Sequence, residues 1–288
     1  MRVFISADIE GTAFTTVWPE TGKGQEDYPA AARQMTLETK AACEGAIAAG
    51  ADYILIKDAH GSARNIDPNE IPACAEIIRG WSGGPLAMVE GINESFDAAV
   101  FIGYHAAAGR IGNPLSHTYS TATTQVKLNG VDCSEFMLYS LCAASFGVPT
   151  VFLSGDKMLT EDSKDLHPLL KTVWAKDGFG GYTKCRQPQL VCDLIRQGVE
   201  EALKQDLGRG LCEIPKEFVL ELSYKEHRDA VCNSNYPGFK LIDSHTIRME
   251  TDDLFDVLRC VPFIFSEGGF PFCSLVRTFV RRREQRLK

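Results

Sequence analysis

The chain has 288 residues, more than a typical single domain, so we expect one large domain or two. Its 44% hydrophobic and 24% charged residues are typical of globular proteins and exclude a disordered or fibrous chain. The formal net charge of −8 argues against nucleic acid and anionic membranes as partners, because both attract clustered lysine and arginine, and it favours small or peptidic substrates.

The first half of the chain repeats a short apolar run, a polar stretch and a longer helical stretch. The runs are rich in β-branched and aromatic residues and do not alternate with polar ones, which is typical of parallel strands buried on both faces. They are Val3–Ala7, Tyr53–Lys57, Ala98–Tyr104 and Pro149–Ser154. The pattern predicts an α/β fold, an open and mainly parallel sheet flanked by helices.

Three segments between and after these runs are dense in helix formers. Tyr28–Ala49 is predicted to be a crossover helix, closed by Gly50 as the residue after its C-cap. Ser134–Phe146 and Gln189–Lys204 are predicted helices for similar reasons, the second with its apolar positions close to one face.

The sequence pattern changes from about Ile214 onward, where shorter strand-like runs precede a helix-like stretch. We therefore predict an α/β domain over residues 1–212 and a smaller C-terminal α+β region over residues 213–288, available for contacts with other chains. The basic run Phe279–Lys288 is interpreted as a solvated helix face or a frayed tail.

The N-terminus and the cysteines indicate a cytoplasmic protein. Acidic residues interrupt the first apolar run at once, which argues against a signal peptide, and no window approaches the ~20 apolar residues of a membrane span. The ten cysteines are scattered and form no CxxC motif. Several lie in apolar stretches, so reduced and mostly buried thiols are predicted.

Polar side chains follow three of the predicted strands. Asp8 and Glu10 come directly after the first strand, and the period of two points both carboxylates to one side. His60 follows the second strand and His105 the third. Because ligands bind at the carboxyl edge of an open α/β sheet, we expect these four side chains to form a metal site.

Two carboxylates and two imidazoles suit zinc and other divalent transition metals better than magnesium. A third carboxylate would support a pair of metals, and Glu135 is a candidate because its helix directly follows LNGVDC and should start near the sheet. Asp58 shares a strand end with His60, where it could orient that imidazole, cap a turn or bind metal.

The remaining histidines are less informative. His117 lies in a polar loop and could be a general acid or base, a metal ligand or an exposed side chain. His167, His227 and His245 lie in polar or helical contexts, and surface or structural roles are expected for them.

Six segments of the sequence resemble the DppA family of D-aminopeptidases, the M55 metallopeptidases. They occur in order, at near-constant spacing, over about the first 160 residues: SADIEG (6–11), KDAHG (57–61), GYHA (103–106), SHT (116–118), GVDCSE (130–135) and GVPTVFLSGD (147–156).

The resemblance implies a zinc aminopeptidase that hydrolyses the N-terminal peptide or amide bond of short peptides with a free N-terminus and a preference for D-residues. It implies two zinc ions per chain and a closed homo-oligomer, a decamer, with active sites facing an inner chamber. Asp8 corresponds to the carboxylate that bridges both zinc ions, and His117 to the catalytic histidine. The remaining zinc ligands correspond to Glu10, His60, His105 and Glu135.

Two departures from the family pattern bear on the substrate pocket: Lys157 follows Gly155-Asp156 where a second aspartate is usual, and residues 178–189 lack the expected Ser/Arg-rich segment.

One alternative function is that of a DEDD-type exonuclease, which also opens with a DxE strand and uses two metals, but the strand-end histidines and the acidic charge argue against it. Another is a metal-binding relative that has lost catalysis.

Overall fold

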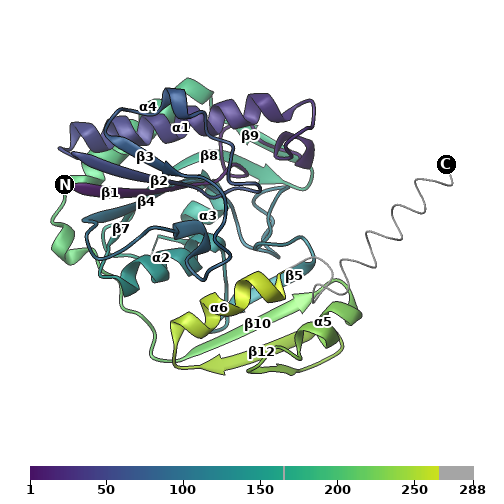
Figure 1. Cartoon of the computed structure of the whole chain (residues 1–288). Coiled ribbons are helices and arrows are strands. Elements are labelled where there is room, and N and C mark those ends of the chain that lie inside the picture. The colour runs from purple at the N-terminus through teal and green to yellow at the C-terminus, as the bar shows by residue number, and fades with distance from the viewer. Residues whose placement is uncertain (165, 266–288) are drawn as a thin grey trace. The chain divides into compact units, whose positions relative to one another are not determined.

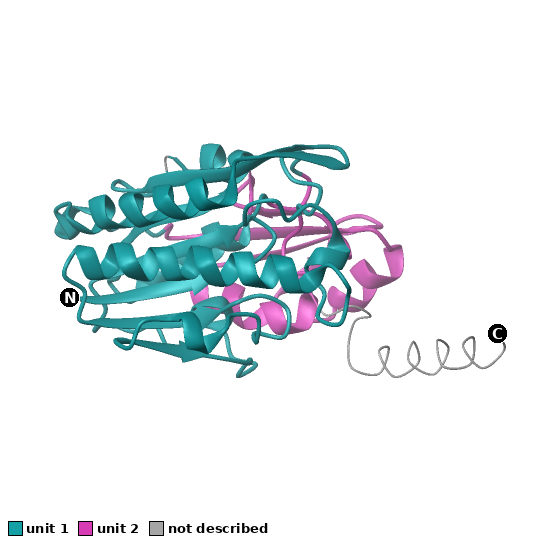
Figure 2. Cartoon of the chain, turned by 90° about the horizontal axis from the view of Figure 1, so that it is seen from above, with its two compact units in different colours: residues 1–106, 110–116, 134–214 teal, residues 107–109, 117–133, 215–288 magenta. Residues whose placement is uncertain are grey.

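The computed structural model describes residues 1–164 and 166–265 (Figure 1). The chain divides into two compact units (Figure 2). The first comprises residues 1–106, 110–116 and 134–214, and the second comprises residues 107–109, 117–133 and those from 215 onward. The predicted basic tail, Phe279–Lys288, lies outside the described residues.

A seven-stranded sheet forms the centre of the first unit, in the order β3-β2-β1-β4-β7-β8-β9. All neighbouring strands are parallel except β8 and β9, and β1, β4 and β7 are almost wholly buried. This sheet confirms the predicted fold class. The strands are β1 (Arg2–Ala7), β2 (Tyr53–Asp58), β3 (Ala75–Ile78), β4 (Ala98–Tyr104), β7 (Thr150–Asp156), β8 (Lys171–Phe179) and β9 (Tyr182–Cys185).

Helices cover both faces of this sheet (Figure 1). On one face α1 and α4 share an apolar core with the strands, and on the other α2 packs Phe136 edge-on against Phe101 of β4 at 5.1 Å between ring centroids. Gly50 follows α1 with a φ of 96°, the left-handed conformation expected there. The helices are α1 (Tyr28–Ala48), α2 (Glu135–Ser145), α3 (Lys157–Asp162) and α4 (Pro188–Leu203), with single 3-10 turns at Trp18–Glu20, Pro68–Glu70, Ala87–Val89 and Leu207–Arg209.

The second unit contains an antiparallel sheet in the order β11-β12-β10-β5-β6. Along β10, buried and half-buried residues alternate, so this sheet buries mainly one face. The unit differs from the predicted region 213–288, because β5 pairs with β10 and brings residues 117–133 into it. Its elements are β5 (Thr123–Leu128), β6 (Val131–Asp132), β10 (Phe218–Tyr224), α5 (His227–Asn233), β11 (Phe239–Leu241), β12 (Thr246–Thr251) and α6 (Leu254–Ile264).

The described cysteines are all free thiols, as predicted, and five of the nine are buried. Cys273 lies outside the described residues. Over residues 1–164 and 166–265, the helices lack the combination of length and apolarity that crossing a membrane requires.

Candidate metal centre

The sheet topology brings four of the predicted ligands together within the first unit. Asp8 and Glu10 follow β1, which lies between β2 and β4 in parallel register, with Ala7 opposite both Asp58 and Ile102. The loops that carry His60 and His105 therefore begin beside the one that carries the two carboxylates. This is the carboxyl edge where α/β sheets bind ligands.

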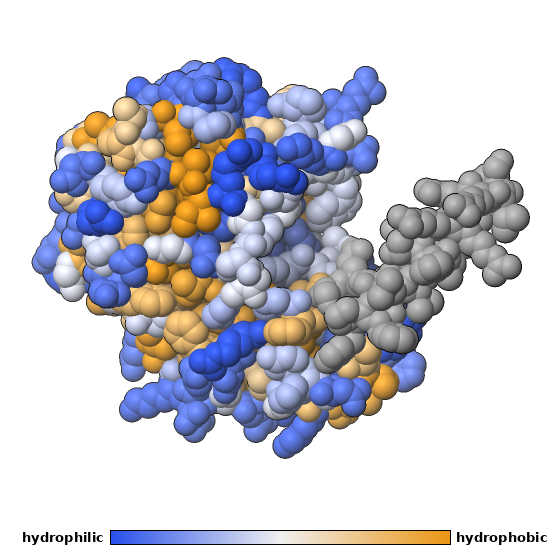
Figure 3. Space-filling model, in the orientation of Figure 1, coloured by the Kyte–Doolittle hydropathy of each residue, from blue (hydrophilic) through white to orange (hydrophobic). Residues whose placement is uncertain are grey.

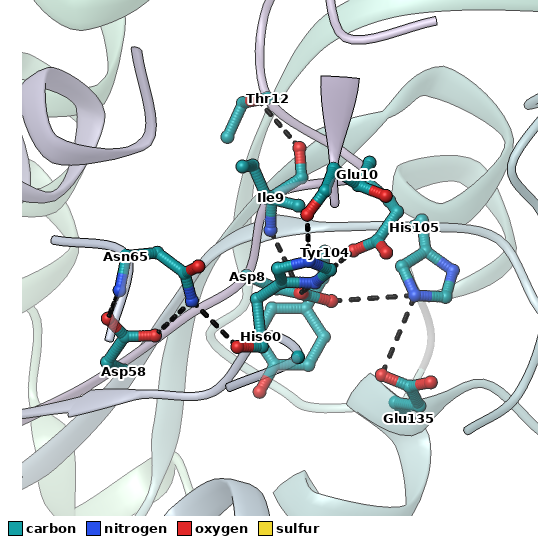
Figure 4. A network of polar contacts seen from close by, with 12 residues as sticks. Asp8, Ile9, Glu10, Thr12, Asp58, His60, Asn65, Tyr104, His105 and Glu135 are labelled. Carbon is teal, nitrogen blue, oxygen red and sulfur yellow. Dashed lines mark hydrogen bonds and ion pairs between the residues drawn. The ribbon is translucent and has the colours of Figure 1, made fainter. Parts of the chain in front are cut away.

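All five predicted ligands meet at this edge (Figure 4). His60 Nδ1 lies 3.2 Å from Asp8 Oδ1 and 3.0 Å from Glu10 Oε2. His105 Nε2 lies 3.5 Å from Asp8 Oδ2 and 3.6 Å from Glu135 Oε2. The two oxygens of Asp8 thus face different histidines, and each histidine has a second carboxylate beside it.

Glu135 is placed by the start of α2. The sequence predicted a helix beginning at Ser134; Ser134 is in fact its N-cap, and its Oγ accepts a hydrogen bond from Met137 N at 3.1 Å. Glu135 is consequently the first helical residue, where the positive end of the helix dipole favours a carboxylate. Its side chain is 5% exposed and faces His105.

Each histidine has a backbone carbonyl beside the ring nitrogen that faces away from the carboxylates. His60 Nε2 lies 2.9 Å from Thr21 O, and His105 Nδ1 lies 3.1 Å from Ala106 O. A neutral imidazole that donates to this carbonyl directs the lone pair of its other nitrogen at the carboxylates. That arrangement is the usual one for a metal-ligating histidine.

Asp58 shapes the loop that carries His60 and is not placed as a ligand. Its Oδ2 accepts hydrogen bonds from Asn65 N at 2.5 Å and Ile66 N at 2.9 Å, and its Oδ1 accepts one from Asn65 Nδ2 at 2.7 Å. Asn65 Nδ2 also donates to His60 O at 2.7 Å. Of the roles that the sequence left open for Asp58, the structure therefore favours orienting the His60 loop.

The charges of the buried carboxylates favour a bound cation. Burial, followed by the neighbouring Glu10 carboxylate, raises the pKa of Asp8 to about 8. Burial by itself lowers the pKa of His105, yet the Glu135 and Asp8 carboxylates raise it to about 10. Asp8 Oδ2 is buried and accepts no hydrogen bond from the described residues. Three carboxylates and two imidazoles in one buried cluster fit divalent zinc, which takes nitrogen and oxygen ligands.

Two glycines allow the loops to approach this closely. A Cβ on Gly11 would lie 1.7 Å from Tyr104 O, and one on Gly103 would lie 2.3 Å from Asp8 O. Gly103 also has a φ of 70°, which side chains other than glycine rarely adopt. The glycines that follow Glu10 and precede Tyr104 in the sequence are therefore required by packing at the metal centre.

Sequence reasoning missed the polar residues behind the ligands. Lys176 of β8 and Asn113 both donate to Glu10 O, and burial lowers the pKa of Lys176 to about 8. Asp156 accepts a hydrogen bond from Ala106 N at 2.7 Å, next to His105. Asp156 ends a motif that the sequence did single out. Lys176 lies in an ordinary strand sequence that carries no such signal.

The other histidines are distributed over both units. His117 is half-buried in a loop of the second unit, and its catalytic role stays a prediction from the sequence. His167 is buried and packs edge-on against Phe136 at 6.0 Å between ring centroids; burial lowers its pKa to about 4, as for a neutral structural histidine. His227 and His245 are exposed.

Comparison with known proteins identifies relatives over most of the chain. A family model described as Peptidase_M55, D-aminopeptidase, matches residues 1–263. A D-aminopeptidase of Bacillus subtilis (strain 168) is 24% identical over 264 residues, which are 91% of this chain and 95% of that protein. A solved structure, described as the Zn-dependent D-aminopeptidase DppA from Bacillus subtilis, a self-compartmentalizing protease, has a TM-score of 0.85 at 22% identity and covers 92% of this chain and 96% of its own. These findings confirm the predicted resemblance and fold.

Proposed function

The chain belongs to the M55 peptidase family of D-aminopeptidases, and we propose that it is a zinc enzyme that removes the N-terminal residue of short peptides, with a preference for D-residues. The observation that carries this proposal is the buried cluster of Asp8, Glu10, His60, His105 and Glu135. The DEDD-type exonuclease is not favoured, because the match to the M55 peptidase family covers residues 1–263.

We propose that the cluster holds two zinc ions, with Asp8 shared between them. Asp8 Oδ1 and Glu10 lie beside His60, while Asp8 Oδ2 and Glu135 lie beside His105. Each side thus offers one imidazole, one carboxylate of its own and one oxygen of Asp8. Three protein ligands with room for a further one are typical of catalytic zinc.

The chemistry needs Lewis-acid polarisation of the scissile carbonyl and a water molecule of lowered pKa, and zinc supplies both when bound. The residues of the chain hold and orient that metal. Thr21 O and Ala106 O keep the outward nitrogens of His60 and His105 protonated, so that the inward nitrogens remain available as ligands. Asp58 holds the loop in which His60 lies.

We propose His117 as the catalytic histidine, either donating a proton to the leaving amine or stabilising the oxyanion. Support comes from its position in the SHT segment, which resembles the family pattern. His117→Ala should keep its full zinc content and lose turnover. A variant with full zinc and full turnover would remove this role.

We also propose assembly into a closed homo-oligomer, a decamer, in the cytoplasm. Support comes from a relative described as self-compartmentalizing and from the free thiols of the described cysteines. Apolar residues reach the surface in several patches (Figure 3), and Phe179 and Tyr182 are each 61% exposed. Such patches commonly mark interfaces between protein chains. Sedimentation of the purified protein should give about ten chains per particle, and a monomer would contradict the assembly.

The two departures from the family pattern lie close together in the first unit. Lys157 begins α3, and its Nζ lies 3.1 Å from Asp177 Oδ2 on β8. Residues 178–189 contain β9, which pairs with β8. We propose that these changes affect which substrates are accepted and leave the metal ligands unchanged, since the ligands lie on other elements.

A matched panel of substrates tests the function. Aminoacyl amides and short peptides, each in D and L form, are assayed with the zinc-loaded full-length protein and with protein treated with a chelator. We expect release of the N-terminal amino acid from the D series, loss of turnover on chelation and recovery with zinc. Protein that binds zinc but cleaves neither series would point to a relative that has lost catalysis.

A further inference from the structure

The backbone carbonyl of Glu10 accepts hydrogen bonds from two buried side chains. Lys176 Nζ lies 2.5 Å from Glu10 O, and Asn113 Nδ2 lies 2.9 Å from it. These donors come from positions 166 and 103 residues along the chain, so the fold brings both to a single atom. That atom belongs to a proposed zinc ligand.

Lys176 holds the turn after Glu10 at both ends. Its side chain is fully buried on β8, and its Nζ also donates to Thr15 O. Between these two carbonyls, Ala13 N donates to the buried Glu38 Oε1 at 2.8 Å. Burying an ammonium group is costly unless its hydrogen bonds are well made. Here those bonds fix the path of residues 10–15.

Asn113 links the same carbonyl to the other side of the metal centre. Its Nδ2 also lies 3.1 Å from Asp156 Oδ2, which in turn accepts a hydrogen bond from Ala106 N at 2.7 Å. Ala106 follows His105. Asn113 is 4% exposed, so the chain of contacts is shielded from competing water. The backbones that carry Glu10 and His105 are therefore tied together through one amide and one carboxylate.

We propose that Lys176 and Asn113 are positioning residues that set the Glu10 carboxylate against His60 for binding zinc. The inference rests on the proposed zinc function of the cluster. A shift of the Glu10 peptide would move its Oε2, which lies 3.0 Å from His60 Nδ1. The next residue, Gly11, packs closely against the β4 end of the site: its N donates to Gly103 O at 2.8 Å, and a Cβ on it would lie 1.7 Å from Tyr104 O. The two donors thus act on the metal through the backbone and do not touch it.

Lys176→Met tests this positioning role, since methionine fills much of the space of the lysine side chain and donates no hydrogen bond. The zinc affinity of the metal-free full-length variant is measured by competition with a chromophoric chelator, well below its unfolding temperature. We expect a loss of about 10- to 100-fold, the range found when the groups that orient metal ligands are removed. The control is Val199→Ala, a buried position of α4, which should lower the unfolding temperature and leave zinc affinity unchanged.

Asn113→Leu provides a second route if Lys176→Met does not fold. We expect a similar direction of effect, and the double variant should lose less affinity than the product of the two single losses, because both donors act on one carbonyl. Zinc affinity equal to wild type in either folded single variant would overturn the inference. Wild-type protein that binds no zinc would instead overturn the proposed function, so the two failures are distinguishable.

Discussion

Asp8 separates the metal centre into two sides that are built differently. On one side, His60 lies in a loop after β2 and its side chain is 12% exposed. On the other, His105 directly follows β4 and is 1% exposed, opposite Glu135 at the start of α2. The His60 side therefore depends on the hydrogen bonds of a loop, and the His105 side depends on a buried strand end and a helix N-terminus.

A single cluster of candidate ligands thus combines two kinds of structural support. Asp58 and Asn65 hold the loop around His60, whereas Asp156 fixes Ala106 beside His105. If the two sides bind separate zinc ions, substitutions on one side should affect one ion more than the other. Substitutions at Asp8 should affect both.

The largest effect is expected from Asp8→Ala, which removes the carboxylate common to the two sides. We expect loss of zinc and of all measurable turnover, because the proposed pair of ions would lose the carboxylate that they share. Mass spectrometry of the metal content checks the first outcome and the D-aminoacyl amide assay the second. Glu44→Ala, which removes an exposed carboxylate of α1, is the matched control. Unchanged zinc content in Asp8→Ala would contradict the shared role.

His60→Ala and His105→Ala should each remove one of the two proposed zinc ions and strongly reduce turnover. Each variant loses the imidazole of one side and keeps the ligands of the other, so the remaining ion should be retained. Metal content, measured after dialysis against zinc-free buffer, distinguishes the sides. Loss of both ions in both variants would show that the sites fill only as a pair and would contradict the independence of the two sides.

Asp58→Asn and Asp156→Asn form a smaller matched pair. Asparagine replaces an acceptor oxygen by an amide, so Asp58→Asn should loosen the His60 loop and Asp156→Asn the backbone at His105. We expect each to weaken zinc binding by about 10- to 100-fold on its own side. Asp156→Asn should also weaken the His60 side to a smaller extent, because Asp156 accepts a hydrogen bond from Asn113, which holds Glu10 O. Stepwise zinc titration resolves the two sites. Equal weakening of both steps in either variant would contradict independent support.

The smallest effect concerns the pH dependence of stability in metal-free protein. The folded-state pKa of His105 is raised from 6.5 to about 10, so the folded state binds this proton more tightly than the unfolded state does. That stabilisation is fully present below pH 6.5 and is lost as pH rises through about 10. Over this window the midpoint of thermal unfolding should fall by a few degrees.

Zinc-loaded protein should show a smaller fall, because a ligating imidazole is already neutral throughout the window. In the metal-free state, His105→Asn should flatten the fall, whereas His60→Asn should leave the part due to His105. A fall of equal size in metal-free wild type and His105→Asn would assign the pH dependence to other groups.

The position of the metal centre was predictable because local patterns carry it. Unbroken apolar runs indicate parallel strands, and parallel strands place their carboxyl ends at one edge, so Asp8, Glu10, His60 and His105 could be grouped before any contact was known. Glu135 needed the family resemblance, because its approach to His105 depends on where α2 begins relative to β4.

Several elements escaped sequence reasoning for physical reasons. β3 is short and only half-buried, and β8 mixes polar and apolar residues, so neither resembles the runs that mark the central strands. β5 lies in a polar segment that followed the predicted catalytic loop. Its pairing with β10 joins residues about a hundred positions apart, which is why the second unit begins earlier in the chain than predicted.

The grouping of the strand-end side chains, the parallel sheet and the expectation of zinc over magnesium could be predicted from the sequence alone, because burial pattern and ligand chemistry are local properties. Three features become visible only in the folded chain: Asp8 turns one oxygen toward each histidine, Asp58 supports a loop, and Lys176 and Asn113 meet at Glu10 O. Those arrangements depend on hydrogen bonds between distant segments. The donors carry no distinctive pattern in the sequence, and their hydrogen bonds become strong only where the fold excludes water.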